Sequence, residues 1–201
     1  MVDYNKRQNQ IIEAAIEVIA ESSIQALTVK RLAEKIGISD AALYRHFKNK
    51  MEILEAVLCY FEGERKIFFD KVIDSTEGAI EKIESIFQHH LALFTRKPAL
   101  AAVIFSEDIF LNDEYLAKKV LVIMAQAQAS FLKIISSSNH GSNRLREDVP
   151  VEHLAVIILG SLRLIVTKWH LGKHNFDLIK EGETLWSSLR KIILEPLMEQ
   201  P

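Results

Sequence analysis

The chain has 201 residues, of which 49% are hydrophobic, and its formal net charge is −2 at pH 7. This composition predicts a folded protein with a substantial core and excludes an intrinsically disordered chain. A single cysteine, Cys59, excludes an intrachain disulfide and a cysteine metal cluster. The first residues lack the apolar segment of a signal peptide, so we expect a cytoplasmic location.

Two short helices joined by a tight turn are predicted between residues 28 and 47. Thr28 stands where a helix N-cap belongs, and residues 29–36 carry an apolar stripe at helical spacing. Gly37 marks the turn, because glycine tolerates the positive φ that such a stop requires. Ser39 is suited to cap the second helix, which we expect to run from Asp40 to Phe47.

The outer face of this second helix has the character of a surface that enters the DNA major groove. Ala41 and Ala42 are small enough to let the backbone approach the bases, and an alanine methyl can contact a thymine methyl. Tyr44, His46 and Lys50 are suited to phosphate oxygens. The alternative is an ordinary helical hairpin with a solvated basic face, because this geometry also occurs in proteins that bind no DNA.

The distribution of charge supports an anionic partner for this region. Residues 1–50 hold eight Lys or Arg against six Asp or Glu, a charge of +2, whereas residues 51–201 carry −4. Local charge rather than the net charge of the chain sets the attraction to phosphates. Asn49, with Glu52 three residues later, predicts the capped start of a third helix.

This stretch resembles the DNA-binding domain of the TetR family of bacterial transcriptional regulators, over about residues 5–65. The resemblance is carried by an amphipathic helix and then by Leu27-Thr28-Val29, Leu32-Ala33, Gly37-Ile38-Ser39, Leu43-Tyr44-Arg45-His46-Phe47 and Lys50. It implies phosphate contacts from Thr28, Tyr44, His46 and Lys50, and base-edge contacts from Lys30, Ser39, Asp40, Ala41 and Ala42. Asp40 and Ala42 are not typical strong base readers, so the bases that are read stay open.

Beyond residue 50 every long segment has helical periodicity, which predicts an all-α protein of about nine helices. Apolar spacing predicts helices over residues 54–72, 80–94 and 116–134, with a short helix that begins at Pro98. Residues 136–143 are predicted to form the clearest loop. Two further helices are expected from Pro150 to about His170 and from about Phe176 to Glu195, before Pro196. We therefore expect a three-helix helix-turn-helix DNA-binding domain over residues 5–65 and a larger helical effector-binding and dimerisation domain over residues 66–201.

Residues 154–166 are apolar on nearly every side. A membrane span is disfavoured, because the run is shorter than the roughly 20 residues that a bilayer needs and contains Arg163. A helix that is apolar all round must be buried all round, which predicts a subunit interface where Gly160 and Ser161 allow close approach. The resemblance implies the same arrangement, a homodimer through the two C-terminal helices on a pseudo-palindromic site in double-stranded DNA.

The resemblance also implies a small-molecule pocket in the helices after residue 50. The candidate lining residues are Phe87, His90, Phe94, Phe105, Met124, Gln128, Phe131, Arg163 and Trp169. A mostly apolar lining with a few polar groups suits a hydrophobic or amphipathic effector. For each aromatic taken singly, a place in the packed core is the favoured alternative. Arg163 either meets a ligand carboxylate or pairs with Glu107 or Asp108.

Neither a metal site nor an enzyme is expected. His170 and His174 are four apart, as in helical zinc pairs, but Gly172 lies between them and no third ligand is evident. The sequence contains no nucleophile elbow, phosphate-cradling glycine loop or helical His-Glu zinc signature, so no cofactor is predicted. We expect a homodimeric, ligand-responsive regulator, most often a repressor in such families. The alternative is a DNA-bound structural or interaction protein of the same fold without an effector.

Overall fold

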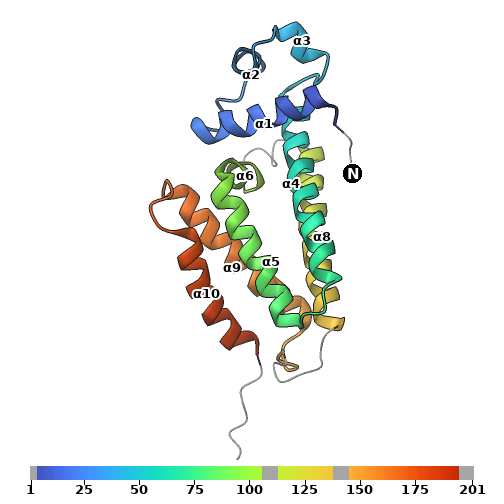
Figure 1. Ribbon diagram of the computed structural model, residues 1–201, viewed down its shortest axis with the longest axis vertical. Helices are drawn as coiled ribbons and strands as arrows, with labels where there is room; N and C mark the ends of the chain where they lie inside the picture. The colour runs from blue at the N-terminus through green and yellow to red at the C-terminus, as the bar shows by residue number, and fades with distance from the viewer. Residues whose placement is uncertain (1–3, 106–112, 138–144, 195–201) are drawn as a thin grey trace, which may run out of the picture. The chain divides into compact units, whose positions relative to one another are not determined.

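The computed structural model describes residues 4–105, 113–137 and 145–194 (Figure 1). Within these ranges the regular elements are nine α-helices, and the only β pairing is an isolated bridge between Leu145 and Leu194. The all-α prediction is thus confirmed. The chain forms two compact units, one of residues 1–66 and 96–122 and one of residues 67–95 and 123–201.

The first unit contains α1 (Lys6–Glu21), α2 (Val29–Ile36), α3 (Asp40–Tyr44) and α6 (Pro98–Ile104), together with the first parts of α4 (Lys50–Ile73) and α8 (Glu114–Ser137). A capping box starts α1, because Asn5 Oδ1 accepts from the Gln8 amide and Gln8 Oε1 accepts from the Asn5 amide. The apolar face of α1 is buried, and α1 packs against both α2 and α6. The preceding amphipathic helix that the motif requires is therefore present.

Side chains of α4 contact the residues at the start of α6 and of α8 in this unit. The Lys97 ammonium, just before α6, lies 4.3 Å from the centroid of the Tyr60 ring. Glu55 accepts a 2.6 Å hydrogen bond from the Tyr115 hydroxyl at the start of α8. The first unit is thus a helix-turn-helix supported by α4, α6 and the start of α8.

The second unit contains α5 (Ala79–Arg96, up to Thr95), α9 (Val151–Leu171), α10 (Leu178–Ile193) and the remaining parts of α4 and α8. The buried Lys82 ammonium donates to the Ile73 carbonyl at 2.9 Å, which places a cation at the C-terminal end of α4. A Cβ at Gly182 on α10 would lie 2.2 Å from a methyl of Leu91 on α5. These two helices therefore meet closely, and α9 packs against α10.

The predicted helices are found with small changes at their ends. The clearest correction is α3, which ends at Tyr44 rather than at Phe47. The amides of Arg45, His46 and Phe47 all converge on the Leu43 carbonyl, so the chain winds into a tighter turn and leaves the α-helix. Most of the predicted loop 136–143, the helix end at Glu195 and Pro196, and the suggested Arg163 partners Glu107 and Asp108 lie outside the described residues.

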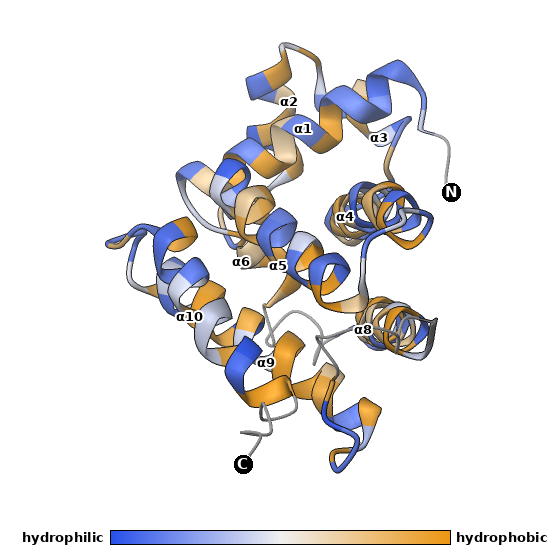
Figure 2. Cartoon of the chain, turned by 60° about the horizontal axis from the view of Figure 1, so that its bottom comes forward, coloured by the Kyte–Doolittle hydropathy of each residue, from blue (hydrophilic) through white to orange (hydrophobic). Residues whose placement is uncertain are grey.

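Two of the described helices, α8 over residues 114–136 and α9 over residues 151–171, are long and apolar enough to cross a membrane by length and composition alone. Hydrophobic residues cover much of α9 (Figure 2). A membrane span was disfavoured partly because the apolar run is short, but the run lies inside a helix of 21 residues, which is long enough to cross a bilayer. Only 39% of the most apolar part of α9 is buried by the chain itself, so much of its apolar surface is exposed.

The loop between α1 and α2 generates a stability prediction. Lys50 Nζ donates to the Ile24 carbonyl at 2.8 Å, and partial burial lowers the pKa of this ammonium. We expect Lys50→Met to lower the free energy of unfolding by about 1 kcal/mol, because a hydrogen bond to a charged group is lost while removal of a partly buried charge offsets part of that loss. Lys48→Met, at an exposed neighbouring position, is the control in chemical denaturation. Equal stability of the two variants would contradict this assignment.

Candidate nucleic-acid interface

The turn between α2 and α3 is built by three predicted residues. Thr28 Oγ1 accepts from the Arg31 amide at 3.2 Å, and Ser39 Oγ accepts from the Ala42 amide at 3.2 Å. Between the helices Gly37 adopts φ +67° and ψ +38°, the left-handed conformation that glycine enters without strain. Both caps and the glycine turn are therefore confirmed.

The start of α4 is also capped, with a variation on the expected pattern. Asn49 Oδ1 accepts from the Glu52 amide at 2.9 Å, as a capping residue does. The Glu52 carboxylate, however, accepts from the Lys48 amide at 2.7 Å rather than from the Asn49 amide. The two bonds together fix residues 48 and 49 between α3 and α4.

The inward and outward sides of α3 and of the turn after it are sharply separated. Leu43 and Phe47 are buried at 0% and 4% exposure, whereas the Tyr44 side chain next to them is 51% exposed. Among the other candidate DNA contacts, Ala42, His46 and Lys50 are half-buried. The exposed ones are Thr28, Lys30, Ser39, Asp40 and Ala41. The motif thus presents polar and small groups to solvent while its apolar groups form the core.

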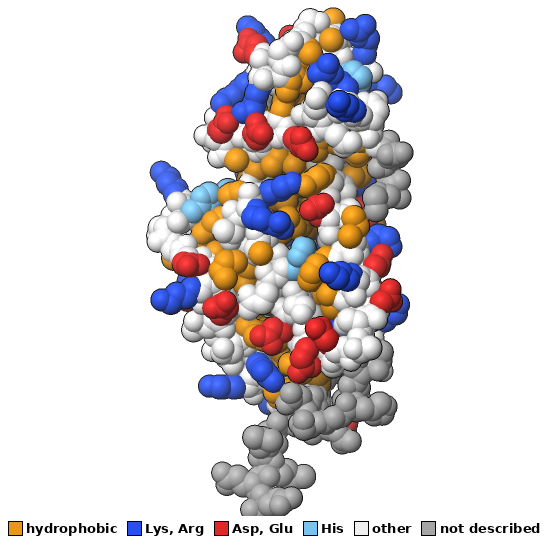
Figure 3. Space-filling model, viewed as in Figure 1, with side chains coloured by type: hydrophobic (Ala, Val, Ile, Leu, Met, Phe, Trp, Pro, Cys, Tyr) orange, Lys and Arg blue, Asp and Glu red, His pale blue; other side chains and the backbone are white. Residues whose placement is uncertain are grey.

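Basic residues of the first unit divide into paired and exposed groups. The Lys35 ammonium lies 3.2 Å from a Glu17 oxygen and 2.7 Å from a Glu21 oxygen, and the hydrogen bond from Lys35 lowers the pKa of Glu21. Arg31 donates to Ser22 Oγ at 2.6 Å. Lys30, Arg45 and Lys48 are exposed. Figure 3 shows Lys and Arg side chains gathered around α2 and α3, with acidic side chains over α1.

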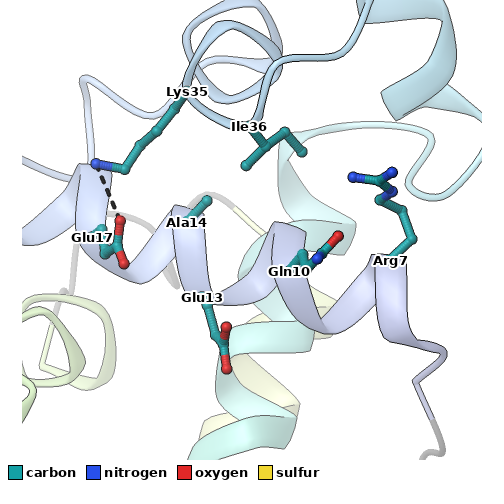
Figure 4. Close-up of a pocket in the computed structure, with 7 residues that line it drawn as sticks. All are labelled: Arg7, Gln10, Glu13, Ala14, Glu17, Lys35 and Ile36. Carbon is teal, nitrogen blue, oxygen red and sulfur yellow. Dashed lines mark ion pairs between the residues drawn. The ribbon is translucent and has the colours of Figure 1, made fainter.

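An open groove of about 490 Å³ lies between α1 and α2 (Figure 4). Its lining mixes both charges with little apolar surface: Arg7, Gln10, Glu13, Ala14, Glu17, Lys35 and Ile36. None of these belongs to the predicted effector residues. The Lys35–Glu17 ion pair crosses the groove, so it joins α1 to α2.

The candidate effector residues differ widely in burial. Phe87, Phe94, Phe131, Trp169 and His90 are buried, with exposures from 0 to 6%. The others are half-buried or, at Met124, 48% exposed: Phe105, Met124, Gln128 and Arg163. Phe105 belongs to the first unit and the rest belong to the second.

Within the second unit, two further aromatics lie against the candidate effector residues. Phe69 lies with its ring centroid 5.8 Å from His90 and 6.1 Å from Phe131, so it brings α5 and α8 residues together. Trp186 lies 5.4 Å from Phe87. His90 is oriented by a 2.8 Å hydrogen bond between Nδ1 and the Ile86 carbonyl. Apolar spacing predicted the helices that carry Phe69 and Trp186, but it does not show which residues of different helices meet.

His170 lies at the end of α9, and His174 lies in the turn that follows. Their ring centroids are 5.9 Å apart, and burial, then the neighbouring His174, lowers the pKa of His170. His174 has a positive φ of 62° and packs against Trp169 at 4.0 Å. Among the described residues no three His, Cys, Asp or Glu side chains are grouped to hold a metal ion.

Comparison with known proteins agrees with this geometry. The profile of "Bacterial regulatory proteins, tetR family" matches residues 11–57, and that of "YsiA-like protein, C-terminal region" matches residues 64–191. The chain is 29% identical over 170 residues to the fatty acid metabolism regulator protein of Bacillus subtilis, covering 85% of this chain and 87% of that protein. It is 23% identical over 190 residues to the nucleoid occlusion factor SlmA of Vibrio vulnificus, covering 92% and 94%.

Solved structures show the same fold. The crystal structure of a transcriptional regulator FadR from Bacillus subtilis in complex with stearoyl-CoA has a TM-score of 0.76, with 24% identity over 92% of this chain and 98% of that one. FadR from Bacillus halodurans has a TM-score of 0.74, with 19% identity over 94% and 97%. Together, the capped helix-turn-helix and the two matching profiles show that this chain belongs to the TetR family and is a DNA-binding transcriptional regulator.

Proposed function

We propose that the protein is a cytoplasmic homodimeric repressor, which binds a pseudo-palindromic operator and is released by an amphipathic acyl effector. The observation that carries the proposal is the α2–α3 motif, in which two capped helices and a left-handed glycine fix an exposed polar face. Such a surface suits a major groove, because small residues approach the bases while flanking polar groups meet phosphates.

Position in the motif and exposure support the roles proposed for its residues. Thr28, Tyr44 and His46 contact phosphates, and Lys30 contacts base edges. The first turn of α3 does so as well, through Ser39, Asp40, Ala41 and Ala42. Lys50 has three N–H donors and gives one to the Ile24 carbonyl, so two remain for a phosphate oxygen. The exposed Lys30, Arg45 and Lys48 supply local positive charge, which offsets the net negative charge of the chain.

The C-terminal helices support dimer formation. On α9, Val156, Ile157, Leu164 and Leu171 are 38–75% exposed, and Ile192 on α10 is 53% exposed. Nothing lies within 4 Å of a Cβ built at Gly160, on the same helix, so a second helix can approach there. A second copy of the chain would cover this apolar surface and place two α3 helices about one DNA turn, or a multiple, apart.

The acyl effector is supported by the buried aromatic side chains of the second unit and by relatives. Phe87, Phe94 and Phe131 are buried apolar groups that suit contact with a hydrocarbon chain, and His90 and Arg163 add polar groups. The Bacillus subtilis regulator was crystallised with stearoyl-CoA. A second candidate, a DNA-bound factor without an effector, is kept because SlmA proteins are similarly related.

Removing one hydroxyl tests the DNA-contact surface. We expect Tyr44→Phe to weaken binding roughly tenfold, because a hydrogen bond to a charged phosphate is lost. The loss should be equal across duplexes selected from a random pool, since phosphates carry no base identity. Tyr115→Phe is a matched control, 60% exposed and bonded to Glu55 in the same unit. Unchanged affinity, or a loss confined to some sequences, would refute the phosphate role of Tyr44.

Charge placed on α9 tests the dimer surface. We expect Leu164→Glu to sediment as a monomer at micromolar concentration and to lose tight binding to the palindrome, because a carboxylate would be buried at the interface. Ile67→Glu on α4 is the control, since Ile67 is 61% exposed and Leu164 is 62% exposed. A Leu164→Glu protein that stays dimeric in analytical ultracentrifugation would exclude this face.

The effector is tested on the protein–DNA complex. We expect saturating stearoyl-CoA to weaken operator binding at least tenfold in fluorescence anisotropy, because an effector that binds the released form more tightly shifts the equilibrium by that difference. Coenzyme A alone should leave affinity unchanged. Tight operator binding that no acyl chain alters would instead support the DNA-bound factor without an effector.

A further inference from the structure

Trp186 carries a buried hydrogen-bond donor that no other part of the described chain satisfies. The side chain is 3% exposed, and its indole N–H has no acceptor among the described residues. Trp169, the other tryptophan of the sequence, behaves differently, because its N–H donates to the Phe176 carbonyl at 3.1 Å. Buried donors are almost always paired, so the Trp186 N–H requires a physical explanation.

Packing between α5 and α10 holds this indole in place. Gly182, one helical turn before Trp186, meets Leu91 so closely that no Cβ fits between them without displacing the leucine. Phe87, one turn before Leu91, contacts the Trp186 ring at 5.4 Å. The ring is therefore confined between two helices, and its N–H cannot turn out into bulk water for a partner.

The surroundings define the chemistry of a suitable partner. An indole N–H donates only, so the partner must offer an acceptor oxygen. Phe87 and Leu91 are fully buried apolar side chains, so the rest of the partner must be apolar. A hydrocarbon chain that ends in a carbonyl or a carboxylate meets both requirements.

We propose that Trp186 is the polar anchor of the effector site, whose N–H donates to the oxygen at the head of an acyl chain packed against Phe87. This inference rests on the proposed acyl effector and adds a residue outside the predicted lining. The oxygen belongs either to the carboxylate of a free fatty acid or to the thioester carbonyl of an acyl-CoA. Both share the same acceptor chemistry, so the experiment separates them.

An isosteric replacement tests the N–H without changing the shape of the ring. Benzothienylalanine has sulfur in place of the indole N–H, and we would introduce it at position 186 of the full chain. We expect affinity for stearate or for stearoyl-CoA, whichever Trp186 anchors, to fall about tenfold, with no decrease in the denaturant midpoint. Titrations with stearate and with stearoyl-CoA show which oxygen is bound, because only the ligand anchored by Trp186 loses affinity.

The same replacement at position 169 is the matched control. There the N–H is already bonded to Phe176, so we expect the denaturant midpoint to fall and effector affinity to be kept. A fall in the midpoint at position 186 would overturn the inference, because the N–H would then be paired in the free protein. Wild-type affinity for both ligands at position 186 would overturn it and leave the proposed function standing. Failure of the wild-type protein to bind either ligand would overturn both.

Discussion

The left-handed turn at Gly37 is the constraint on which the DNA-binding surface depends. It reverses the chain between α2 and α3 within a few residues, so that Leu32 and Leu43 both become fully buried. Any residue with a side chain would be strained at φ +67°, and a wider turn would rotate α3 about its axis. Because α3 is only five residues long, such a rotation would carry Ala41 and Tyr44 away from the exposed surface together.

The local parts of this motif were predictable because their causes are local. A hydroxyl before an apolar run caps the helix that follows it, and Thr28 and Ser39 do so through their own backbone neighbours. The length of α3 was not predictable, since apolar spacing continues to Phe47 while the backbone leaves the helix after Tyr44. Apolar spacing shows which side chains point inward, and Phe47 points inward whether the backbone around it is a helix or a tight turn.

Partners that are distant in sequence were also beyond prediction. Lys35 counts as one positive charge in the sequence, but two glutamates of α1 surround it in the structure. Lys50 was selected for phosphate binding, and its link to Ile24 across 26 positions was not visible. The same limit applies to Phe69 and Trp186, because periodicity places them on inward faces without naming the aromatic rings they meet.

The apolar character of α9 makes sense only when its two faces are considered separately. Leu154, Ile158 and Leu162 are buried within the chain, whereas Val156 and Leu164 are more than half exposed. Charged residues occur along the helix, namely Glu152, Arg163 and Lys168. A bilayer would surround them as well, and burial is costly for any charge that lies deep in the hydrocarbon. A second protein surface can cover the exposed apolar face and leave the charged groups in water. The exposed apolar face of α9 is thus consistent with the proposed dimer interface, although the helix is also long and apolar enough to cross a membrane.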